Sequence, residues 1–227
     1  MNPISELFVD TKRSIKLFSD IYLSTIADKK HKPRLLLIGS YGSPFLRSVN
    51  KMAKEVGINS RMMNHLPPVI GNCKVVVDKE TCNTVKALPA KADVDHLYNP
   101  GTSCVMEAVY CLLHLTMNLK GKNITIVGRG HAVQGLAERL LSENATVTVA
   151  HSYTKDLYEV MHDRDIVVLA TPTISDVPRA KLVLDIGGAL TQEQLGELPT
   201  GCIYEKGIGK LTNAILLSRV AGTCDRP

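Results

Sequence analysis

The chain has 227 residues, 27 basic and 22 acidic side chains, a formal net charge of +5 and 44% hydrophobic residues. This length fits one domain or two small lobes, and this composition excludes a disordered chain. Aromatic residues make up only 4% and Trp is absent, which argues against a base-stacking surface, and the short basic cluster at 29–34 fits a solvated loop better than a nucleic-acid patch. We therefore expect no nucleic-acid partner.

The first ten residues lack the basic start and the continuous apolar stretch of a signal peptide. No apolar run approaches the length of a membrane span. None of the six cysteines forms a C-x-x-C pair, so we expect reduced thiols and no metal site. These features predict a cytoplasmic protein with no membrane partner.

The first hundred residues predict a small α/β lobe. Apolar residues at helical spacing predict a helix over 4–28, and the buried-type run 34–39 predicts a strand. A helix is expected over 46–56. The following stretch is less regular, with a possible strand at 74–77 and a possible short helix at 80–87.

The second half alternates strands with helices, which indicates a parallel sheet. A long apolar helix is expected over 104–119. The elements expected after it are strands at 123–127, 146–150, 166–170, 182–186 and 202–204, and helices at 133–142, 156–161 and 211–220. We thus expect an α/β fold of two lobes: a substrate lobe over 1–100, and over 101–227 a Rossmann-type parallel sheet with helices on both faces, whose C-terminal helix packs back.

The strongest local motif joins the strand at 123–127 to the next helix through Gly128 and Gly130. Gly128 permits a tight turn, and Gly130 allows the backbone to approach a pyrophosphate that faces the helix start, where His131 and Val133 lie. The spacing is G-x-G-x-x-x-x-G, longer than the usual dinucleotide fingerprint. The motif therefore predicts dinucleotide binding, with a structural turn of another α/β fold as the alternative.

The end of the next strand indicates which dinucleotide is bound. A carboxylate there would accept hydrogen bonds from the ribose of NAD, but this chain has His151 and Ser152. Arg129 in the glycine loop has the charge to hold a 2′-phosphate. The cofactor is predicted to be NADP, with NAD possible, unless Arg129 is an exposed side chain without a ligand.

Two acidic residues, Asp93 and Asp95, precede the long helix at 104–119. They lack the further close ligands of a metal site. They are either solvated loop or capping residues or, if two lobes face each other, substrate anchors.

Several blocks, in order, resemble the bifunctional methylenetetrahydrofolate dehydrogenase/cyclohydrolase (FolD-type) family. The similar segments are K-A-D-V-D (91–95), K-N-I-T-I-V-G-R-G-H-A-V (122–133), N-A-T-V-T-V-A-H-S-Y-T (144–154), 165–170, V-L-D-I-G (183–187) and G-I-G-K-L-T (207–212). The resemblance extends over about 91–220.

The resemblance implies two lobes, with NADP on the second and a tetrahydrofolate between them. It implies hydride transfer from the methylene bridge to the nicotinamide and then hydrolysis of the methenyl product, as in one-carbon metabolism. Arg129 and Ser152 match positions that hold the 2′-phosphate, and Asp93 matches the carboxylate that holds the pterin. It further implies a homodimer and these additional cofactor-binding residues: Gly128, Gly130, His131, Val133, His151, Thr171, Gly207 and Thr212.

The chain departs from this family in its first lobe. The family's hydrolytic Lys and its Tyr correspond here to Val49 and Phe45, and its Q-L-P-L-P segment is missing. Lys51 is the nearest candidate for that Lys, although two residues turn a helix by about 200°. Hydride transfer needs mainly proximity and orientation, whereas hydrolysis needs a positioned proton-transfer group. The sequence thus favours the dehydrogenase step over the cyclohydrolase step.

The resulting hypothesis is NADP-dependent oxidation of 5,10-methylenetetrahydrofolate, possibly followed by hydrolysis to 10-formyltetrahydrofolate, with Lys51 and Asp93 as candidate catalytic residues. One alternative is an NAD(P)-dependent oxidoreductase of the same fold that acts on another substrate. The other is a dinucleotide-binding protein without catalytic activity.

Overall fold

A computed structural model describes residues 10–223, which divide into two compact units. One unit, called the cofactor lobe below, holds residues 10–15 and 105–209. The other, called the small lobe, holds residues 16–104 and 210–223.

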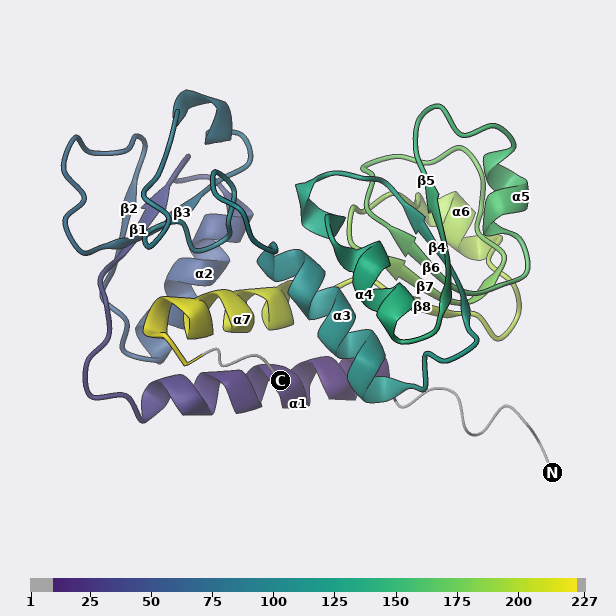
Figure 1. The fold of residues 1–227 in the computed structure, drawn as a ribbon, viewed down its shortest axis with the longest axis horizontal. Coiled ribbons are helices and arrows are strands. Elements are labelled where there is room, and N and C mark those ends of the chain that lie inside the picture. The colour runs from purple at the N-terminus through teal and green to yellow at the C-terminus, as the bar shows by residue number, and fades with distance from the viewer. Residues whose placement is uncertain (1–9, 224–227) are drawn as a thin grey trace. The chain divides into compact units, whose positions relative to one another are not determined.

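The cofactor lobe is built on a five-stranded parallel sheet of order β5-β4-β6-β7-β8 (Figure 1). Its strands are β4 (Asn123–Val127), β5 (Thr146–Ala150), β6 (Arg164–Leu169), β7 (Ala180–Asp185) and β8 (Ile203–Glu205). The side chains of 166–169 and 182–185 are all buried, as expected for inner strands covered on both faces.

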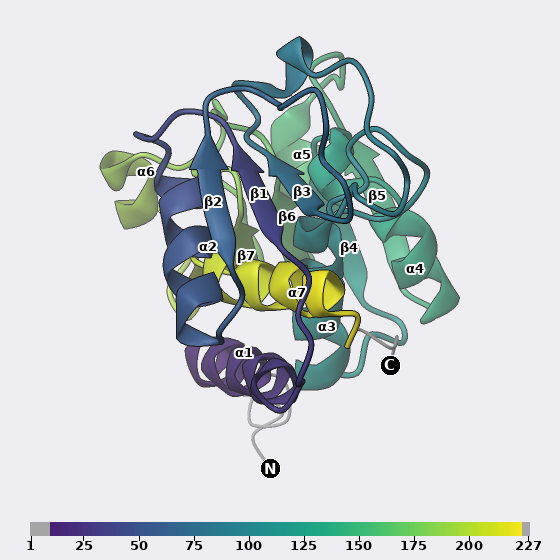
Figure 2. The same ribbon diagram turned by 90° about the vertical axis from the view of Figure 1, so that its left-hand side faces the viewer.

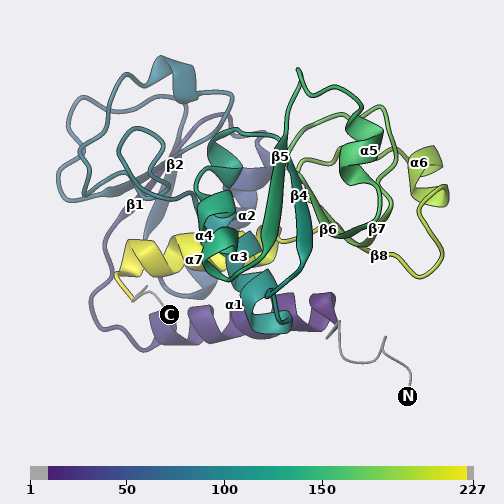
Figure 3. The same ribbon diagram turned by 45° about the vertical axis from the view of Figure 1, so that its right-hand side comes forward.

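Helices cover both faces of this sheet, as the sequence predicted. Figure 3 shows α4 (Leu136–Ser142) and α5 (Leu157–Met161) on opposite sides of β4 and β5. The short α6 (Gln192–Gly196) follows β7, and α3 (Cys104–Thr116) precedes β4. Glu107 of α3 forms an ion pair of 3.1 Å with Arg139 of α4, which ties these two helices together.

The small lobe contains a three-stranded parallel sheet of order β2-β1-β3, seen side by side in Figure 2. Its strands are β1 (Leu35–Ile38), β2 (Ser60–Met63) and β3 (Lys74–Val77). Helix α2 (Pro44–Glu55) begins at its cap Ser43 and packs on β1 and β2. The opposite face packs against residues that follow the strands, in a cluster that includes Leu36, Ile38, Val75, Val85 and Leu88.

The last helix completes the small lobe. In α7 (Gly209–Ala221) nearly every side chain is buried, and the Asn213 amide donates to the Ser48 hydroxyl of α2 at 2.9 Å. The Lys29 ammonium, just after α1 (Thr11–Ala27), donates to the Ala221 carbonyl at 2.6 Å. The lobes therefore differ from the expected division at residue 100: the C-terminal helix belongs with the small sheet, and 10–15 belong with the cofactor lobe.

The two-lobe α/β architecture is confirmed, and some local predictions are wrong. Strand β2 and helix α6 were not predicted, since both are short and β2 is only half-buried. The helix expected at 80–87 is a single 3-10 turn, η1 (Cys82–Thr84), and the helix expected at 104–119 ends at Thr116. The first part of the helix expected at 4–28 lies outside the described residues, and α1 itself starts at Thr11.

Candidate functional site

The predicted cofactor residues lie mostly at one edge of the five-stranded sheet. The parallel register pairs Val127 with both Ala150 and Leu169, so β4, β5 and β6 end at the same level. The chain leaves β4 toward β5 on one side, and β6 lies on its other side. In open α/β sheets such a switch point, at the carboxyl ends of the strands, is where ligands bind.

Gly128 allows the chain to turn tightly at this switch point. Its N–H donates to the Ala150 carbonyl at 2.8 Å, and its φ is +118°, a value that favours glycine. A side-chain carbon at this position would lie 2.9 Å from the Ala170 carbonyl oxygen. The sequence motif thus identified a turn that only glycine fits.

The loop after this turn is open at Gly130. A side-chain carbon at Gly130 would meet no atom within 4 Å, so space is left for a group that approaches the backbone. A 3-10 turn, η2 (His131–Val133), follows, and α4 begins only after Gly135, which has a φ of +83°. The prediction of a helix from residue 133 is therefore wrong, because Gly135 interrupts it. Val133, the last residue of η2, is buried.

His151 and Ser152 follow β5, at the position where many NAD-binding proteins have a carboxylate. The His151 N–H donates to the Thr154 hydroxyl at 2.8 Å, and His151 Nδ1 accepts the Tyr153 N–H at 3.2 Å, which fixes a compact turn. Ser152 is exposed, and so is Arg129 in the glycine loop. Within the described residues Arg129 has no carboxylate partner, which leaves its charge available for an anionic ligand.

The next two strands bring Thr171 and Gly187 together at the same edge. The Gly187 N–H donates to the Leu169 carbonyl at 3.0 Å. A side-chain carbon at Gly187 would lie 2.0 Å from the Thr171 carbonyl oxygen, so glycine is required here too. Thr171, half-buried, is therefore held beside the turn that follows β6.

Asp185, the carboxylate at the end of β7, has a structural role. It accepts the Ala189 N–H at 2.8 Å, the Leu190 N–H at 3.2 Å and the Tyr204 hydroxyl at 3.0 Å. Burial raises the pKa of Tyr204 to about 12, and its hydrogen bond to Asp185 adds to the rise. Asp185 is 1% exposed, and its oxygens are occupied by these three hydrogen bonds.

The remaining two predicted cofactor residues, Gly207 and Thr212, belong to different lobes. Gly207, which follows β8 in the cofactor lobe, is exposed and has a φ of +152°. Thr212 belongs to α7 of the small lobe, where it is 6% exposed and its hydroxyl oxygen has no hydrogen-bond partner among the described residues.

The small lobe carries the two predicted catalytic residues. Lys51 lies on the exposed face of α2, whereas Leu46, Val49, Met52 and Ala53 form its buried face. Val49, at the position where the resemblance places a Lys, is fully buried in the core, and Phe45 is half-buried. The helix thus presents neither the Lys nor the Tyr that the resemblance places at these two positions.

Asp93 holds its own loop. Its Oδ2 accepts the N–H groups of Tyr98 at 2.8 Å and Asn99 at 3.0 Å, together with the Asn99 amide at 2.9 Å. Its Oδ1 accepts the Leu97 N–H at 3.0 Å. Asp95 accepts the Cys104 N–H at 2.6 Å, at the start of α3. Both carboxylates therefore organise the segment that leads into α3.

Sequence reasoning missed Asp78, the first residue after β3. It is 7% exposed, and its N–H donates to the Ile38 carbonyl at 2.8 Å. It follows the apolar run at 75–77 directly, so the rule that polar residues at carboxyl ends of parallel strands bind ligands would have selected it. The irregular sequence around 74–77 predicted this strand only weakly, so its carboxyl end carried no site prediction.

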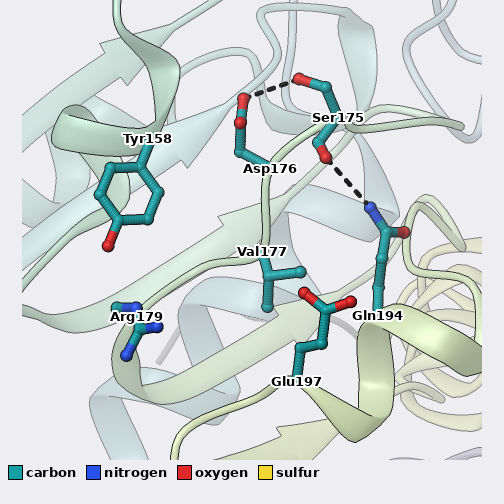
Figure 4. A pocket seen from close by; sticks show the side chains of 7 residues that line it. All are labelled: Tyr158, Ser175, Asp176, Val177, Arg179, Gln194 and Glu197. Atoms are coloured by element: carbon teal, nitrogen blue, oxygen red, sulfur yellow. Dashed lines mark hydrogen bonds between the residues drawn. The ribbon is translucent and has the colours of Figure 1, made fainter.

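A pocket of about 550 Å³ lies elsewhere in the cofactor lobe (Figure 4). Tyr158 of α5, Arg179 and the α6 region line it, and Gln194 donates to the Ser175 carbonyl at 3.4 Å across its rim. None of the predicted cofactor residues lines this pocket. Within residues 10–223 no group of side chains is arranged to hold a metal, and no helix is long and apolar enough to cross a bilayer.

Comparison with known proteins shows which family the chain belongs to. A family model described as the NAD(P)-binding domain of tetrahydrofolate dehydrogenase/cyclohydrolase matches residues 103–226, more than half of the chain. The chain belongs to this family. The sequence resemblance is thereby confirmed, and the glycine loop, the open space at Gly130 and the polar end of β5 fit the binding of NAD(P) by this family's second domain.

Relatives of full length align with nearly the whole chain. The bifunctional protein FolD of Thermotoga maritima is 26% identical over 269 positions, which take in 97% of this chain and 99% of that protein. The bifunctional protein FolD of Lactobacillus helveticus is 28% identical, over 96% of this chain and 82% of that protein. Because 97% of 227 residues is about 220, about 49 of the 269 positions have no residue here.

Solved structures of FolD-type proteins share the fold. The Trypanosoma brucei methylenetetrahydrofolate dehydrogenase-cyclohydrolase, in complex with NADP and an inhibitor, has a TM-score of 0.71 and 21% identity, over 95% of this chain and 96% of that one. A methylenetetrahydrofolate dehydrogenase of the silkworm Bombyx mori has a TM-score of 0.70 and 20% identity, over 96% and 97%.

Proposed function

We propose that this member of the family oxidises 5,10-methylenetetrahydrofolate to the methenyl form with NADP as hydride acceptor. The observation that carries the proposal is the edge of the five-stranded sheet, where a glycine turn at the switch point meets a second strand that ends without a carboxylate. The names of the FolD relatives and the NADP complex of the Trypanosoma brucei enzyme support the same assignment.

Each part of this edge has a role in the proposal. NADP, when bound, supplies the carbon that accepts the hydride. Gly128 makes the turn that would let the backbone at Gly130 lie close to its pyrophosphate, and Arg129 with Ser152 would hold the 2′-phosphate through charge-assisted hydrogen bonds. The Thr171 turn lies beside the same edge and orients the cofactor. Hydride transfer then depends on orientation, which a fixed loop can supply without a proton-transfer residue.

The hydrolytic half of the reaction needs a different explanation here. Val49 is buried in the core of the small lobe, and Lys51 lies on the exposed face of α2. The proposal for the oxidative step requires neither of them.

Assembly and location are also proposed. We expect a homodimer formed through the cofactor lobe, because β5 is an edge strand on which Val149 is 43% exposed and Tyr153, just beyond it, is 82% exposed. Cytoplasmic location is supported by the five described cysteines, all of which are free thiols. Analytical ultracentrifugation of the wild type and a Val149→Lys variant would test the dimer.

The test of function is a titration with NADP and NAD, with and without 5,10-methylenetetrahydrofolate, that follows NADPH absorbance. We expect NADP-dependent oxidation of the folate. Cofactor binding without folate oxidation would reject the substrate and leave a related oxidoreductase or a non-catalytic binding protein. Failure to bind either cofactor would reject the cofactor site itself.

A further inference from the structure

Asp78 stands at the carboxyl end of β3, beside the turn that follows β1. A side-chain carbon on Gly39 would lie 2.6 Å from Asp78 Cβ and 3.3 Å from the Thr81 hydroxyl oxygen, so only a glycine lets these strand ends meet. The Gly39 N–H donates to the Met63 carbonyl at 2.8 Å. The three small-lobe strands therefore end at the same level, and Asp78 lies against the turn at Gly39.

This carboxylate has no partner in the described protein. Its side chain accepts no hydrogen bond, lies within 4 Å of no cation and does not cap η1, although the residue is only 7% exposed. Neither oxygen is among the fully buried polar atoms that lack a partner, so each oxygen keeps some exposure to solvent. A largely enclosed carboxylate that has no partner in the protein and remains open to solvent is free to act on a water molecule or a ligand.

Two other acidic residues of the small lobe, Asp93 and Asp95, are already engaged. Asp93 accepts four hydrogen bonds from its own loop, and Asp95 accepts the first N–H of α3. Asp78 differs from both in that its carboxylate makes no hydrogen bond within the fold, although its backbone does. It also lies where ligands bind in α/β sheets, beyond the carboxyl ends of parallel strands.

We propose that Asp78 is the general base for hydrolysis of the methenyl product, in place of the lysine that this chain lacks. This inference rests on the proposed function. Asp78 takes a proton from water as the water oxygen bonds to the methenyl carbon and the positive charge of the bridge is neutralised. The bridge carbon–N5 bond then breaks: N5 receives the proton from Asp78, and the adduct hydroxyl releases its proton to solvent as the formyl C=O forms. The products are 10-formyltetrahydrofolate and one proton, and Asp78 is again a carboxylate.

Hydrolysis is tested separately from oxidation by supplying 5,10-methenyltetrahydrofolate directly and following the loss of its absorbance above the buffer rate. Asp78→Asn keeps the shape of the side chain and removes the base. We expect it to hydrolyse about 10²–10⁴-fold more slowly. Oxidation of the methylene substrate and NADP affinity should change less than about twofold, because the hydride step depends on orientation. Glu80→Gln, the same chemical change at an exposed neighbour, should leave both reactions unchanged.

Chemical rescue separates catalysis from folding. Asp78→Ala leaves a gap at the strand end, and added formate should restore part of its hydrolytic rate while leaving Glu80→Gln unaffected. Absence of rescue, wild-type hydrolysis by Asp78→Asn, or a wild-type protein that oxidises the folate without hydrolysing the product would each overturn the assignment. A wild type that oxidises no folate would instead reject the proposed function.

Discussion

Arg129 and Ser152 are exposed polar residues on the loops that follow β4 and β5. We expect Arg129→Gln to weaken NADP binding about 10- to 100-fold, since hydrogen bonds to a charged group contribute about 1.5–3 kcal/mol. NAD binding should stay nearly unchanged, because NAD has no 2′-phosphate. Equilibrium titration of both cofactors measures the two affinities.

Arg179→Gln is the matched control for that experiment. Arg179 is exposed in the same lobe and lines the pocket of Figure 4 rather than the glycine loop. It should leave both affinities unaltered. An equal loss of NADP and NAD affinity in Arg129→Gln would mean that this side chain does not distinguish the two cofactors.

Single residues were predictable where a motif required a particular backbone. Gly128 was identified because its turn needs glycine, and the structure shows the Ala170 carbonyl against it. Asp93 and Asp78 show the limit of such reasoning. The sequence cannot tell a carboxylate that accepts four hydrogen bonds from one that accepts none, because the donors lie on backbone that folds around it.

The strand–turn–helix unit of β4, the glycine loop and α4 provides a matched pair of substitutions. In Gly128→Ala the added methyl carbon would lie 2.9 Å from the Ala170 carbonyl oxygen, and the φ of +118° at this position is unfavourable for alanine. We therefore expect this substitution to lower the free energy of unfolding by about 1–3 kcal/mol. In Gly130→Ala the added methyl carbon would have no atom within 4 Å, and the φ of −72° suits alanine. The fold should therefore keep its stability. Urea denaturation of the apo proteins compares them.

Cofactor titration then separates packing from binding. If the pyrophosphate lies against Gly130, Gly130→Ala should weaken NADP binding at least tenfold in a protein of normal stability. Unchanged affinity in that variant would place the pyrophosphate elsewhere on the loop.

Long periodic elements were predicted well, and short ones were not. The buried strands of the five-stranded sheet were found because continuous apolar runs mark inner parallel strands. Strand β2, with sequence S-R-M-M, shows no such run because it is an edge strand and half-buried. Helix α6 has five residues and depends on a capping box between Thr191 and Gln194, a local signal that periodicity does not detect.

At the scale of the whole molecule, the chain keeps the family fold with fewer residues. Parallel strands usually need a crossover of a dozen or more residues, most often through a helix. Here β2 connects to β3 through residues 64–73 and β6 to β7 through 170–179, and neither connection contains a helix. The sequence indicated a departure in the first lobe, because the family's Q-L-P-L-P segment is missing there.

Three tyrosines link stability of the whole molecule to alkaline pH. Burial raises the pKa values of Tyr98, Tyr110 and Tyr204 to about 12, from an ordinary value of 10.0. Nearby acidic groups add to the rise, including the hydrogen bonds from Tyr110 to Glu143 and from Tyr204 to Asp185. The folded protein therefore keeps these phenol protons at pH values where the unfolded chain loses them.

A raised pKa in the folded state gives stability that is complete below about pH 10 and falls as the pH rises toward 12. We expect the urea midpoint to fall progressively across this range, with part of the phenolate absorbance appearing only as the protein unfolds. Tyr204→Phe should be less stable at neutral pH, because Asp185 loses a donor, and should lose less stability on further alkalinisation. Tyr153→Phe, at an 82% exposed position, should follow the wild-type curve. If Tyr204→Phe and Tyr153→Phe lose stability in parallel with the wild type at every pH, the hydrogen bond between Tyr204 and Asp185 does not contribute to the alkaline transition.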